Sequence, residues 1–454
     1  MKVAVVGAGY VGLVTSACLA AQGHTVSCVD LVADRVDMIN RGEVPFHEEG
    51  LQSILSSEVR AGRLTATTSL SDAHRGSDVT FVTVGTPTVN GAVNFRPLDA
   101  AAIDIGRLLG RNESYHTVVV KSTVPPTTTD TRVRGILERE SGKKAGEFGL
   151  VMNPEFLREG CAVHDFLHPD RIVIGAFDDR AFESVRALYA RTEDRIVRTT
   201  PRTAELIKYA TNSLLGTMIS FANELATICE AVPDVDIVDV MQGLHLDRRL
   251  TITQGDGTAE IASYLKAGCG FGGSCLPKDI AALVGFGQSL GLDMAILNGT
   301  LSVNARRRVH VVELAAQALG SLHGRAIAVL GTAFKPNTDD IRESPAVGII
   351  KGLLVRGAEV RAHDPVARLV DTPVSRHPCF TGVRGIDDAL RGADAAIVVT
   401  PWPEYLAMTP QSFKALMKTP ILIDTRRAFS RTAMIEGGMQ YYGAGLASIV
   451  PVSV

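Results

Sequence analysis

The spacing of apolar and polar residues changes twice along this chain of 454 residues. Over roughly the first 200 residues, short apolar runs alternate with stretches of helical periodicity. This alternation predicts a parallel sheet with helices on both faces. The predicted strands are Lys2–Val6, Thr25–Val29, Val79–Val84, Thr117–Lys121, Leu150–Asn153 and Arg171–Ile174, and the predicted helices include Tyr10–Gln22, Leu98–Leu109 and Thr128–Glu140.

The middle of the chain has helical periodicity. In Thr203–Ala231 the apolar residues recur at helical intervals, and Pro233 ends the pattern. Two further runs, Ile280–Leu290 and Leu297–Leu319, have the same period. We therefore expect an all-helical middle segment that contains one long helix.

The alternation of strand and helix returns in the last part of the chain. The predicted strands there are Ala326–Leu330, Glu359–Ala362, Ala395–Val399 and Ile421–Asp424. The opening loop, Gly331-Thr-Ala-Phe-Lys335, follows a strand but lacks the G-x-G-x-x-G spacing. The pattern predicts a second α/β unit whose first loop binds something other than a dinucleotide.

Turn-forming residues follow three strands of the first sheet. They are Gly85-Thr-Pro87, Ser122-Thr-Val-Pro-Pro126 and Asn153-Pro154. Ligands of an open α/β sheet bind outside the carboxyl ends of its strands. These loops are therefore candidates for a functional site by position alone.

The loop after the first strand contains Gly7-Ala-Gly9-Tyr-Val-Gly12 and opens a helix, the context that a dinucleotide loop requires. Such glycines permit a tight turn and a close approach of pyrophosphate to the helix N-terminus. Asp30 ends the next strand, where a carboxylate can bind the ribose hydroxyls and repel a 2′-phosphate. We expect NAD rather than NADP, a preference that nearby Arg35 weakens without reversing. A plain strand-turn-helix is the alternative.

The net charge of −3 gives no basic surplus of the kind found in nucleic-acid-binding proteins. The triplet Arg306-Arg-Arg308 is the possible exception. It falls in a helical pattern, and we expect it on a solvated helix face. The composition therefore predicts no nucleic-acid partner.

The chain has seven cysteines, an odd number, and no C-x-x-C pair. This usage favours reduced thiols, a cytoplasmic location and no metal site. The apolar run Val3–Val6 leads straight into a glycine loop, and no apolar run has the ~18 residues of a membrane span. We expect no membrane partner.

The stretch Gly268-Cys-Gly-Phe-Gly-Gly-Ser-Cys-Leu-Pro-Lys-Asp279 is the most informative for chemistry. It places Cys275 next to a predicted helix start, where an anionic thiolate is stabilised. Glycines around a thiol suggest close approach of the backbone to a ligand. We interpret Cys275 as a nucleophile; a small buried core residue is the alternative and is our expectation for the other six cysteines.

Two pairs of polar residues four positions apart are further candidates. Lys208 and Asn212 share one face of the long helix, where a cation could hold an oxyanion. A lysine that reaches to the surface is the alternative reading. Glu155 and Glu159 follow a strand and suggest a general base or a water-positioning group, although a solvated helix start would have the same pattern.

Taken together, the chain resembles the UDP-glucose/GDP-mannose dehydrogenases over essentially its whole length. The matching motifs are Gly7–Gly12, Lys121–Pro125, Asn153–Gly160, Asp170–Gly175, Ala204–Ala210, Gly270–Asp279 and Phe334–Ser344. The resemblance implies two Rossmann-like, doubly wound parallel-sheet α/β domains joined by a central helical domain with one long helix. The implied domains are residues 1–200 for NAD, 201–320 for dimerisation and 321–454 for the sugar nucleotide. A homodimer or higher homo-oligomer is implied.

The reaction implied by the resemblance is a four-electron, NAD-dependent oxidation of a nucleotide sugar at C6, from UDP-glucose to UDP-glucuronate. Cys275 would capture the aldehyde as a thiohemiacetal that is oxidised to a thioester. Glu155 would be the general base for hydrolysis. The other implied catalytic residues are Lys208 and Asn212, which would hold the oxyanion, and Asp279 and Thr123, which would position water.

The resemblance also implies binding residues. Those for the cofactor are Gly7, Gly9, Tyr10, Val11, Gly12, Asp30, Arg35, Thr86, Ser122, Glu159, Lys278 and Arg342. Those for the substrate are Phe156, Leu157, Lys208, Asn212, Arg249, Tyr264, Lys266, Gly272 and Lys335, with Arg249 reaching the substrate of a neighbouring subunit.

Several alternatives stay open at this point. GDP-mannose could replace UDP-glucose, because Leu276 stands where many UDP-glucose members of the family have phenylalanine and resembles the GDP-mannose members. dTDP-glucose or a UDP-N-acetylhexosamine also stays open, because a change of one hydroxyl or of the base can depend on few contacts. A two-electron hydroxyacid dehydrogenase shares a Rossmann domain and a long helix but needs no nucleophilic thiol. A nucleotide-sugar sensor without catalysis would need neither Cys275 nor Lys208.

Overall fold

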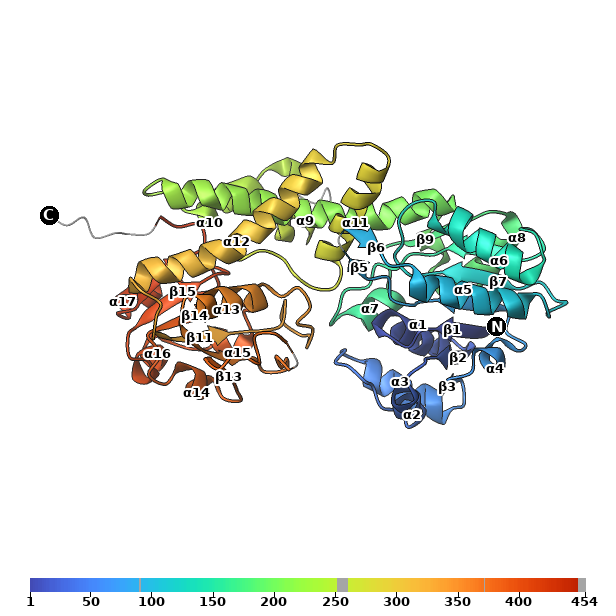
Figure 1. Ribbon diagram of the computed structural model, residues 1–454, viewed down its shortest axis with the longest axis horizontal. Coiled ribbons are helices and arrows are strands. Elements are labelled where there is room, and N and C mark those ends of the chain that lie inside the picture. Colours follow the sequence, from blue (N-terminus) through green and yellow to red (C-terminus); the bar gives the residue numbers. More distant parts are fainter. Residues whose placement is uncertain (90, 251–259, 371, 448–454) are drawn as a thin grey trace. The chain divides into compact units, whose positions relative to one another are not determined.

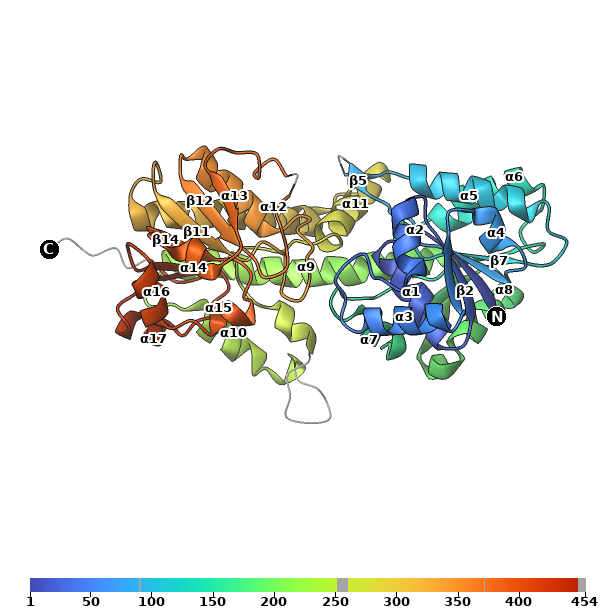
Figure 2. The same cartoon turned by 90° about the horizontal axis from the view of Figure 1, so that it is seen from below.

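The computed structural model describes residues 1–454 with the exception of residues 90, 251–259, 371 and 448–454. The chain forms two compact units, Met1–Thr211 and Asn212–Val454. Helix α9 (Pro201–Ala231) begins in the first unit and continues into the second. It is drawn as one unbroken helix in Figure 2.

The first unit is built on an eight-stranded sheet with the order β10-β9-β8-β7-β4-β1-β2-β3 (Figure 1). The strands are β1 (Lys2–Val6), β2 (Thr25–Val29), β3 (Leu64–Thr67), β4 (Val79–Val82), β7 (Thr117–Val120), β8 (Gly149–Met152), β9 (Ile172–Ala176) and β10 (Ile196–Thr199). A two-stranded hairpin, β5 (Thr88–Val89) with β6 (Ala92–Val93), is separate from this sheet.

One strand pair of this sheet departs from the predicted parallel order. β8 and β9 pair antiparallel, with Met152 opposite Gly175, whereas β9 and β10 pair parallel to each other. The chain that connects β8 to β9 therefore starts and ends at the same edge of the sheet. This edge is the carboxyl edge of β8, so the connection keeps Asn153–Gly160 where ligands of such sheets bind.

Helices cover both faces of the sheet because successive strand residues point to opposite sides. Val118 and Val120 of β7 pack into a buried cluster with α5 and α6, whereas Val119 between them packs into a cluster with α1, α7 and α8. The helices of this unit are α1 (Tyr10–Ala21), α2 (Ala33–Asn40), α3 (Leu51–Arg60), α4 (Leu70–His74), α5 (Arg96–Leu109), α6 (Arg134–Ser141), α7 (Ala162–Leu167) and α8 (Asp179–Arg186). A π-helical turn, Thr128–Val133, precedes α6, where the sequence predicted one continuous helix.

The second unit contains a six-stranded sheet with the order β13-β12-β11-β14-β15-β16, and all of its neighbours are parallel (Figure 1). The strands are β11 (Ala326–Leu330), β12 (Glu359–His363), β13 (Phe380–Val383), β14 (Ala395–Val398), β15 (Ile421–Asp424) and β16 (Gln440–Gly443). The helices on this sheet are α13 (Pro345–Val355), α14 (Ile386–Leu390), α15 (Pro403–Leu406), α16 (Pro410–Leu416) and α17 (Arg431–Glu436).

The helical middle of the chain contributes α10 (Ile237–His245), α11 (Leu276–Ser289) and α12 (Ala295–Leu319) besides α9. Val311 and Ala315 of α12 share a buried cluster with Ile327 and Val329 of β11. This packing joins the second part of the helical region to the second sheet. The doubly wound α/β class with a helical middle, predicted from the sequence, is confirmed.

Candidate functional site

The loop between β1 and α1 has the backbone geometry of a phosphate-binding turn. Gly7 has φ +106°, which an L side chain rarely adopts. A Cβ on Gly12 would lie 1.7 Å from the carbonyl oxygen of Gly7, so only glycine permits the turn to close on the helix. Among the described residues, nothing lies within 4 Å of a Cβ built on Gly9, which begins α1 as its N-cap. The open side of Gly9 at a helix N-terminus therefore fits a pyrophosphate.

Asp30 follows β2 and faces this loop. Its Oδ2 accepts the Ala8 N–H at 2.9 Å and the Arg35 guanidinium at 2.9 Å, and its Oδ1 accepts the Val32 N–H at 3.0 Å. Burial alone would raise the pKa of Asp30, but the hydrogen bonds of Val32, Ala8 and Arg35 outweigh burial and hold the pKa below its usual value. The carboxylate keeps acceptor capacity for a ribose hydroxyl. Arg35 is committed to this carboxylate, which fits NAD.

The loops after β4 and β7 are bound to each other. The Thr86 hydroxyl donates to the carbonyl oxygen of Thr123 at 2.7 Å, and the Ser122 hydroxyl donates to that of Val84 at 2.7 Å. Thr86 and Ser122 are buried, whereas the side chain of Thr123 is half-buried. The structure therefore fixes the backbone on which Thr123 is presented.

Glu155 and Lys208 form a buried ion pair. Lys208 Nζ lies 2.9 Å from Glu155 Oε1, and the two side chains are 5% and 7% exposed. Glu155 Oε2 also accepts the N–H of Leu157 at 2.6 Å. Burial would raise the pKa of Glu155, but the charge and hydrogen bond of Lys208 outweigh it, so the pKa lies below its usual value. Neither a surface lysine nor a solvated helix start describes this pair.

A buried lysine that sequence reasoning did not select supports the same loop. Lys121, at the end of β7, donates to Asn153 Oδ1 at 3.0 Å, and Tyr189 donates to the same oxygen at 2.7 Å. Burial lowers the pKa of Lys121 to about 8, with Lys208 acting in the same direction and Glu155 opposing both. The motif that begins at Lys121 matched the family, but only the fold shows that its ammonium fixes the residue two positions before Glu155.

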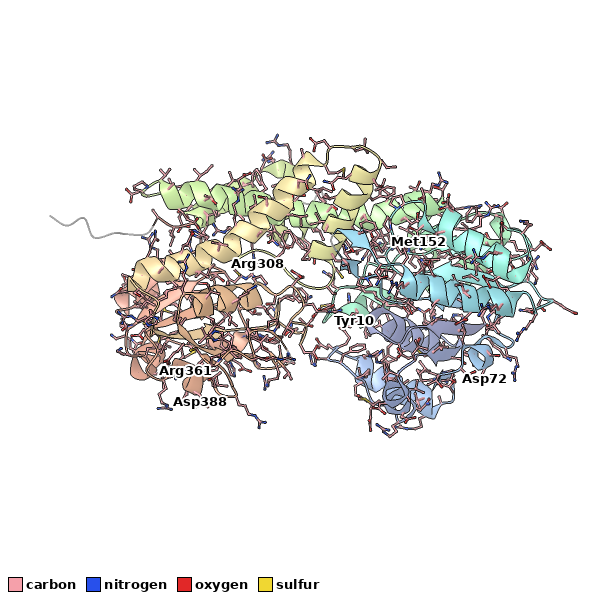
Figure 3. The ribbon with its side chains drawn as sticks, viewed as in Figure 1. Tyr10, Asp72, Met152, Arg308, Arg361 and Asp388 are labelled. Atoms are coloured by element: carbon pink, nitrogen blue, oxygen red, sulfur yellow. The ribbon has the colours of Figure 1, made fainter. Side chains whose placement is uncertain are left out.

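The far end of the Asn153–Gly160 loop is attached to the dinucleotide loop. Tyr10, labelled at the start of α1 in Figure 3, donates its hydroxyl to the buried carboxylate of Glu48. Glu48 in turn accepts the N–H of Gly160 at 2.7 Å and that of Ala162 at 2.7 Å. Glu159, one residue earlier, is half-buried. Tyr10 thus has a structural partner in addition to any role toward a cofactor.

Cys275 is the N-cap of α11, and its side chain is partly exposed. The Ser274 hydroxyl lies 3.6 Å from its sulfur. One turn later, Asp279 is 1% exposed; its Oδ2 accepts the Asn212 amide at 2.6 Å and its Oδ1 pairs with Lys278. The predicted helix start is confirmed, and it brings Asn212, Lys278 and Asp279 together.

Protein packing gives a reason for the glycines before Cys275 that the sequence did not predict. Cβ atoms on them would lie 2.4 Å from Asn304 Oδ1 at Gly270, 2.3 Å from the Glu343 carbonyl oxygen at Gly272 and 2.9 Å from the Phe334 ring at Gly273. Protein atoms therefore occupy the space that a side chain at any of these three positions would need, which requires glycine independently of any ligand. The motifs Gly270–Asp279 and Phe334–Ser344 pack against each other, and the Gly273 N–H donates to the carbonyl oxygen of Arg342 at 2.9 Å.

The remaining predicted binding residues occupy varied surroundings. Arg342 makes a two-bond ion pair with Asp340, and the Lys335 ammonium lies 5.8 Å from the centroid of the Phe334 ring. Arg249 is 89% exposed and pairs with Asp247. In the first unit, Phe156 and Leu157 are half-buried, and Val11 is in the first turn of α1; in the second, Tyr264 is half-buried, Lys266 is exposed and Gly272 is buried.

Two expectations about side-chain exposure are wrong. Arg307 and Arg308 do not lie on a solvated face: Arg307 is 3% exposed and pairs with Glu230, and the Arg308 side chain is 23% exposed. Only Arg306 of the triplet is exposed. Of the other six cysteines, Cys161 and Cys379 are exposed rather than buried, because each lies in a loop before a helix or an edge strand.

Family comparisons match three successive parts of the chain. The models described as UDP-glucose/GDP-mannose dehydrogenase family, NAD binding domain, central domain and UDP binding domain match residues 1–193, 202–306 and 328–431, respectively. The chain belongs to the UDP-glucose/GDP-mannose dehydrogenase family.

Individual members of this dehydrogenase family match the chain along almost its whole length. The chain is 40% identical to a UDP-glucose 6-dehydrogenase of Pseudomonas aeruginosa, covering 98% of this chain and 97% of that protein. A UDP-glucose dehydrogenase structure from Pyrobaculum islandicum superposes with a TM-score of 0.88 at 38% identity, covering 98% of each chain. A UDP-D-ManNAc dehydrogenase structure from Pyrococcus horikoshii superposes with a TM-score of 0.85 at 26% identity, covering 99% of this chain and all of that one.

The protein is therefore an NAD-dependent nucleotide-sugar dehydrogenase. In the part of the chain that the structure describes, no helix combines the length and apolar character needed to cross a membrane. Within the same residues, no group of three or more His, Cys, Asp or Glu side chains could hold a metal ion.

Proposed function

We propose that this dehydrogenase oxidises UDP-glucose to UDP-glucuronate. The observation that carries this proposal is the 40% identity to a UDP-glucose 6-dehydrogenase over 98% of the chain. The superposition on a UDP-glucose dehydrogenase at a TM-score of 0.88 supports it independently.

In the proposed reaction, Cys275 carries the sugar between two oxidations. The C6 alcohol loses a hydride and a proton to become an aldehyde, and the thiol adds to the aldehyde to form a thiohemiacetal. Loss of a second hydride gives a thioester, and water cleaves the thioester to release a carboxylate and the free thiol. Bound NAD supplies the acceptor for each hydride, so two NAD are reduced per sugar. The position of Cys275 at the N-cap of α11 favours the thiolate that must attack.

The polar residues supply proton transfer and charge stabilisation in this proposal. Glu155 acts as general base for hydrolysis, because its depressed pKa keeps it ionised at neutral pH. Lys208 and Asn212 hold the developing oxyanion, a contribution of roughly 3–4 kcal/mol per donor in comparable sites. Asp279 and Thr123 position water.

The binding residues remain proposals as well. The loop Gly7–Gly12 with Asp30 would hold the pyrophosphate and ribose of NAD. The further cofactor contacts are proposed to be Arg35, Thr86, Ser122, Glu159, Lys278 and Arg342, and the substrate contacts Phe156, Leu157, Arg249, Tyr264, Lys266, Gly272 and Lys335. The division into domains at residues 1–200, 201–320 and 321–454 is proposed on the same grounds.

The four-electron reaction is tested by counting NADH released per UDP-glucose consumed, which we expect to be two, and the covalent role is tested by replacing Cys275. Cys275→Ser should bind NAD and sugar almost normally and should lose carboxylate production by at least about 10³-fold, as for other variants that lack their nucleophile. Carboxylate release at the wild-type rate from Cys275→Ser would refute the thioester. A ratio of one NADH per sugar in the wild type would instead indicate a two-electron dehydrogenase.

A UDP-N-acetylhexosamine is the second candidate substrate. It is favoured by the superposition on a UDP-D-ManNAc dehydrogenase over 99% of this chain. Assays of NAD reduction with UDP-glucose, UDP-N-acetylmannosamine, GDP-mannose and dTDP-glucose decide between the sugars and bases. We expect the highest kcat/KM with UDP-glucose.

We further propose that the enzyme is a homodimer or a higher homo-oligomer. In the second unit, α9 exposes Leu214, Phe221 and Ile228 at 51%, 47% and 57%, spaced by one heptad each. Apolar residues at this spacing line one side of a helix and suit a second copy of the same face.

A further inference from the structure

The backbone of the loop before Cys275 is held by side chains from several other segments. Asn223 of α9 accepts the Gly268 N–H at 2.7 Å, and Arg307 of α12 donates to the Gly268 carbonyl oxygen at 3.0 Å. Arg426, which follows β15, donates to the Gly270 carbonyl oxygen at 3.1 Å. The loop residues 268–273 are all buried, although they form neither helix nor strand. A buried irregular loop needs such partners for its peptide groups.

Asn304 binds both polar backbone groups of Phe271. Its Oδ1 accepts the Phe271 N–H at 2.7 Å, and its Nδ2 donates to the Phe271 carbonyl oxygen at 3.1 Å. The amide is 4% exposed, and its oxygen would lie 2.4 Å from a Cβ on Gly270, which has φ +95°. The shape of the loop at Gly270 and the position of Asn304 therefore depend on each other.

Arg308 extends the contact to the segment that ends in Ser344. Its guanidinium donates to the carbonyl oxygens of Phe271 at 3.4 Å and Glu343 at 3.2 Å. Glu343 has φ +51°, a left-handed conformation that its side chain disfavours. Arg308 thus binds the backbone of two loops, the one that contains Phe271 and the one that contains Glu343, which pack closely at Gly272.

We propose that Asn304 and Arg308 are positioning residues that hold the Phe271–Gly273 backbone and thereby fix the Cys275 thiol for capture of the aldehyde. The proposal rests on the covalent role proposed for Cys275. Only Ser274 separates the fixed Gly273 from Cys275, and α11 begins immediately after Cys275. Since misplacement of a reacting group by about 1 Å can cost about 10²-fold in rate, release of this loop should act on the chemical steps rather than on NAD binding.

The test uses Asn304→Ala in the full-length enzyme, with Arg306→Ala as the matched control because Arg306 lies on the same helix and is exposed. We expect Asn304→Ala to lower kcat about 10²-fold with the KM for NAD within about twofold of the wild type. We also expect free aldehyde to escape. NADH per carboxylate should therefore rise above two, and a hydrazine reagent should trap the aldehyde. Arg306→Ala should retain the wild-type ratio and kcat.

Arg308→Ala is the second variant, since its side chain is partly exposed and its loss is less damaging to folding. Arg308→Ala should show a smaller loss of kcat and a smaller rise in NADH per carboxylate than Asn304→Ala. If Asn304→Ala does not fold, Arg308→Ala is the variant that tests the proposal. A wild-type kcat and a ratio of two in every folded variant of Asn304 and Arg308 would overturn the inference. Failure of the covalent role itself would be distinguishable, because Cys275→Ser would then release carboxylate at the wild-type rate.

Discussion

At the scale of single residues, the carboxylate of Glu155 shows how neighbouring charges set an ionisation state. It is buried, and burial alone favours the neutral acid. Lys208 reverses this preference through a 2.9 Å ion pair, so the folded protein keeps a charged base in a dry position. Lys121 contributes a second cation nearby, and burial has already lowered its pKa to about 8. The charge state of Glu155 is therefore a property of three residues rather than one.

Replacing Lys208 by methionine should destabilise the protein by about 3–5 kcal/mol, because it leaves a buried carboxylate without its cation. The pKa of Glu155 should rise, since burial then dominates. The double variant Lys208→Met/Glu155→Gln should recover most of the lost stability, because neither charge remains buried alone. Urea denaturation of the wild type, both single variants and the double variant at pH 7 measures this cycle. Equal losses in Lys208→Met and the double variant would contradict the argument.

At the scale of the secondary-structure element, the sequence predicted features that depend on neighbouring residues. It missed features that depend on residues far apart in the sequence. The strands that carry the site were predicted because they are continuous apolar runs buried on both faces. Within the two large sheets, the strands that were missed are β3, β10, β13 and β16, and each is an edge of its sheet. The short hairpin of β5 and β6 was missed as well. β10 and β13 expose half of their residues or more, so their apolar signal is weak.

In the loops, too, the sequence predicted contacts between neighbouring residues and missed side-chain contacts between distant ones. The tight turn predicted at Gly7, Gly9 and Gly12 is confirmed, because this turn and the helix that follows it are adjacent in sequence. Arg307 was placed on a solvated face because its partner Glu230 lies 77 residues away, and no local pattern shows that pairing. The glycines around Cys275 were identified as special, but the atoms that require them, in Asn304 and Glu343, became visible only in the fold.

The contact between β7 and the segment that contains β4 should make the stability of the protein depend on pH. At the start of β7, His116 is buried; it bonds the Thr80 hydroxyl at 2.8 Å and the Ser77 carbonyl oxygen at 2.9 Å. Burial, with the charge of His74 adding to it, lowers the pKa of His116 from 6.5 to about 3. Below pH 6.5, His116 therefore binds a proton in the unfolded state but stays neutral in the folded state until the pH approaches 3. The stabilisation is complete above pH 6.5 and is lost as the pH falls toward 3.

Between pH 7.5 and pH 5.5 the free energy of unfolding of the wild type should fall by about 1 kcal/mol more than that of His116→Gln. Glutamine keeps a donor and an acceptor but does not titrate in this range. Urea unfolding curves of the two proteins at both pH values test the difference. An identical pH dependence in the two proteins would show that His116 binds protons equally in the folded and unfolded states, so that burial does not lower its pKa.

At the scale of the whole molecule, each unit contains a separate part of the residues in the proposed mechanism. Met1–Thr211 contains the dinucleotide loop and the Glu155–Lys208 pair, and Asn212–Val454 contains Cys275, Asp279 and the second sheet. The boundary between the units falls within α9, between residues 211 and 212. One helix thus supplies Lys208 to the first unit and Asn212 to the second.

The exposed apolar face of α9 is the proposed contact between two copies of the chain. Phe221 is the middle residue of the three heptad-spaced side chains, and burial of such a side chain against a second copy is worth about 1.5–3 kcal/mol. Two copies are changed at once in a symmetric dimer, so Phe221→Lys should raise the dissociation constant by at least about 10²-fold. Val355→Lys is the control, because Val355 is 79% exposed at the end of α13 and lies outside this face. Sedimentation velocity over a range of concentrations should show twice the chain mass for the wild type and for Val355→Lys, and the single-chain mass for Phe221→Lys at low concentration. A wild-type protein that sediments as one chain at all concentrations would refute the dimer, and an unchanged Phe221→Lys assembly would place the interface on another surface.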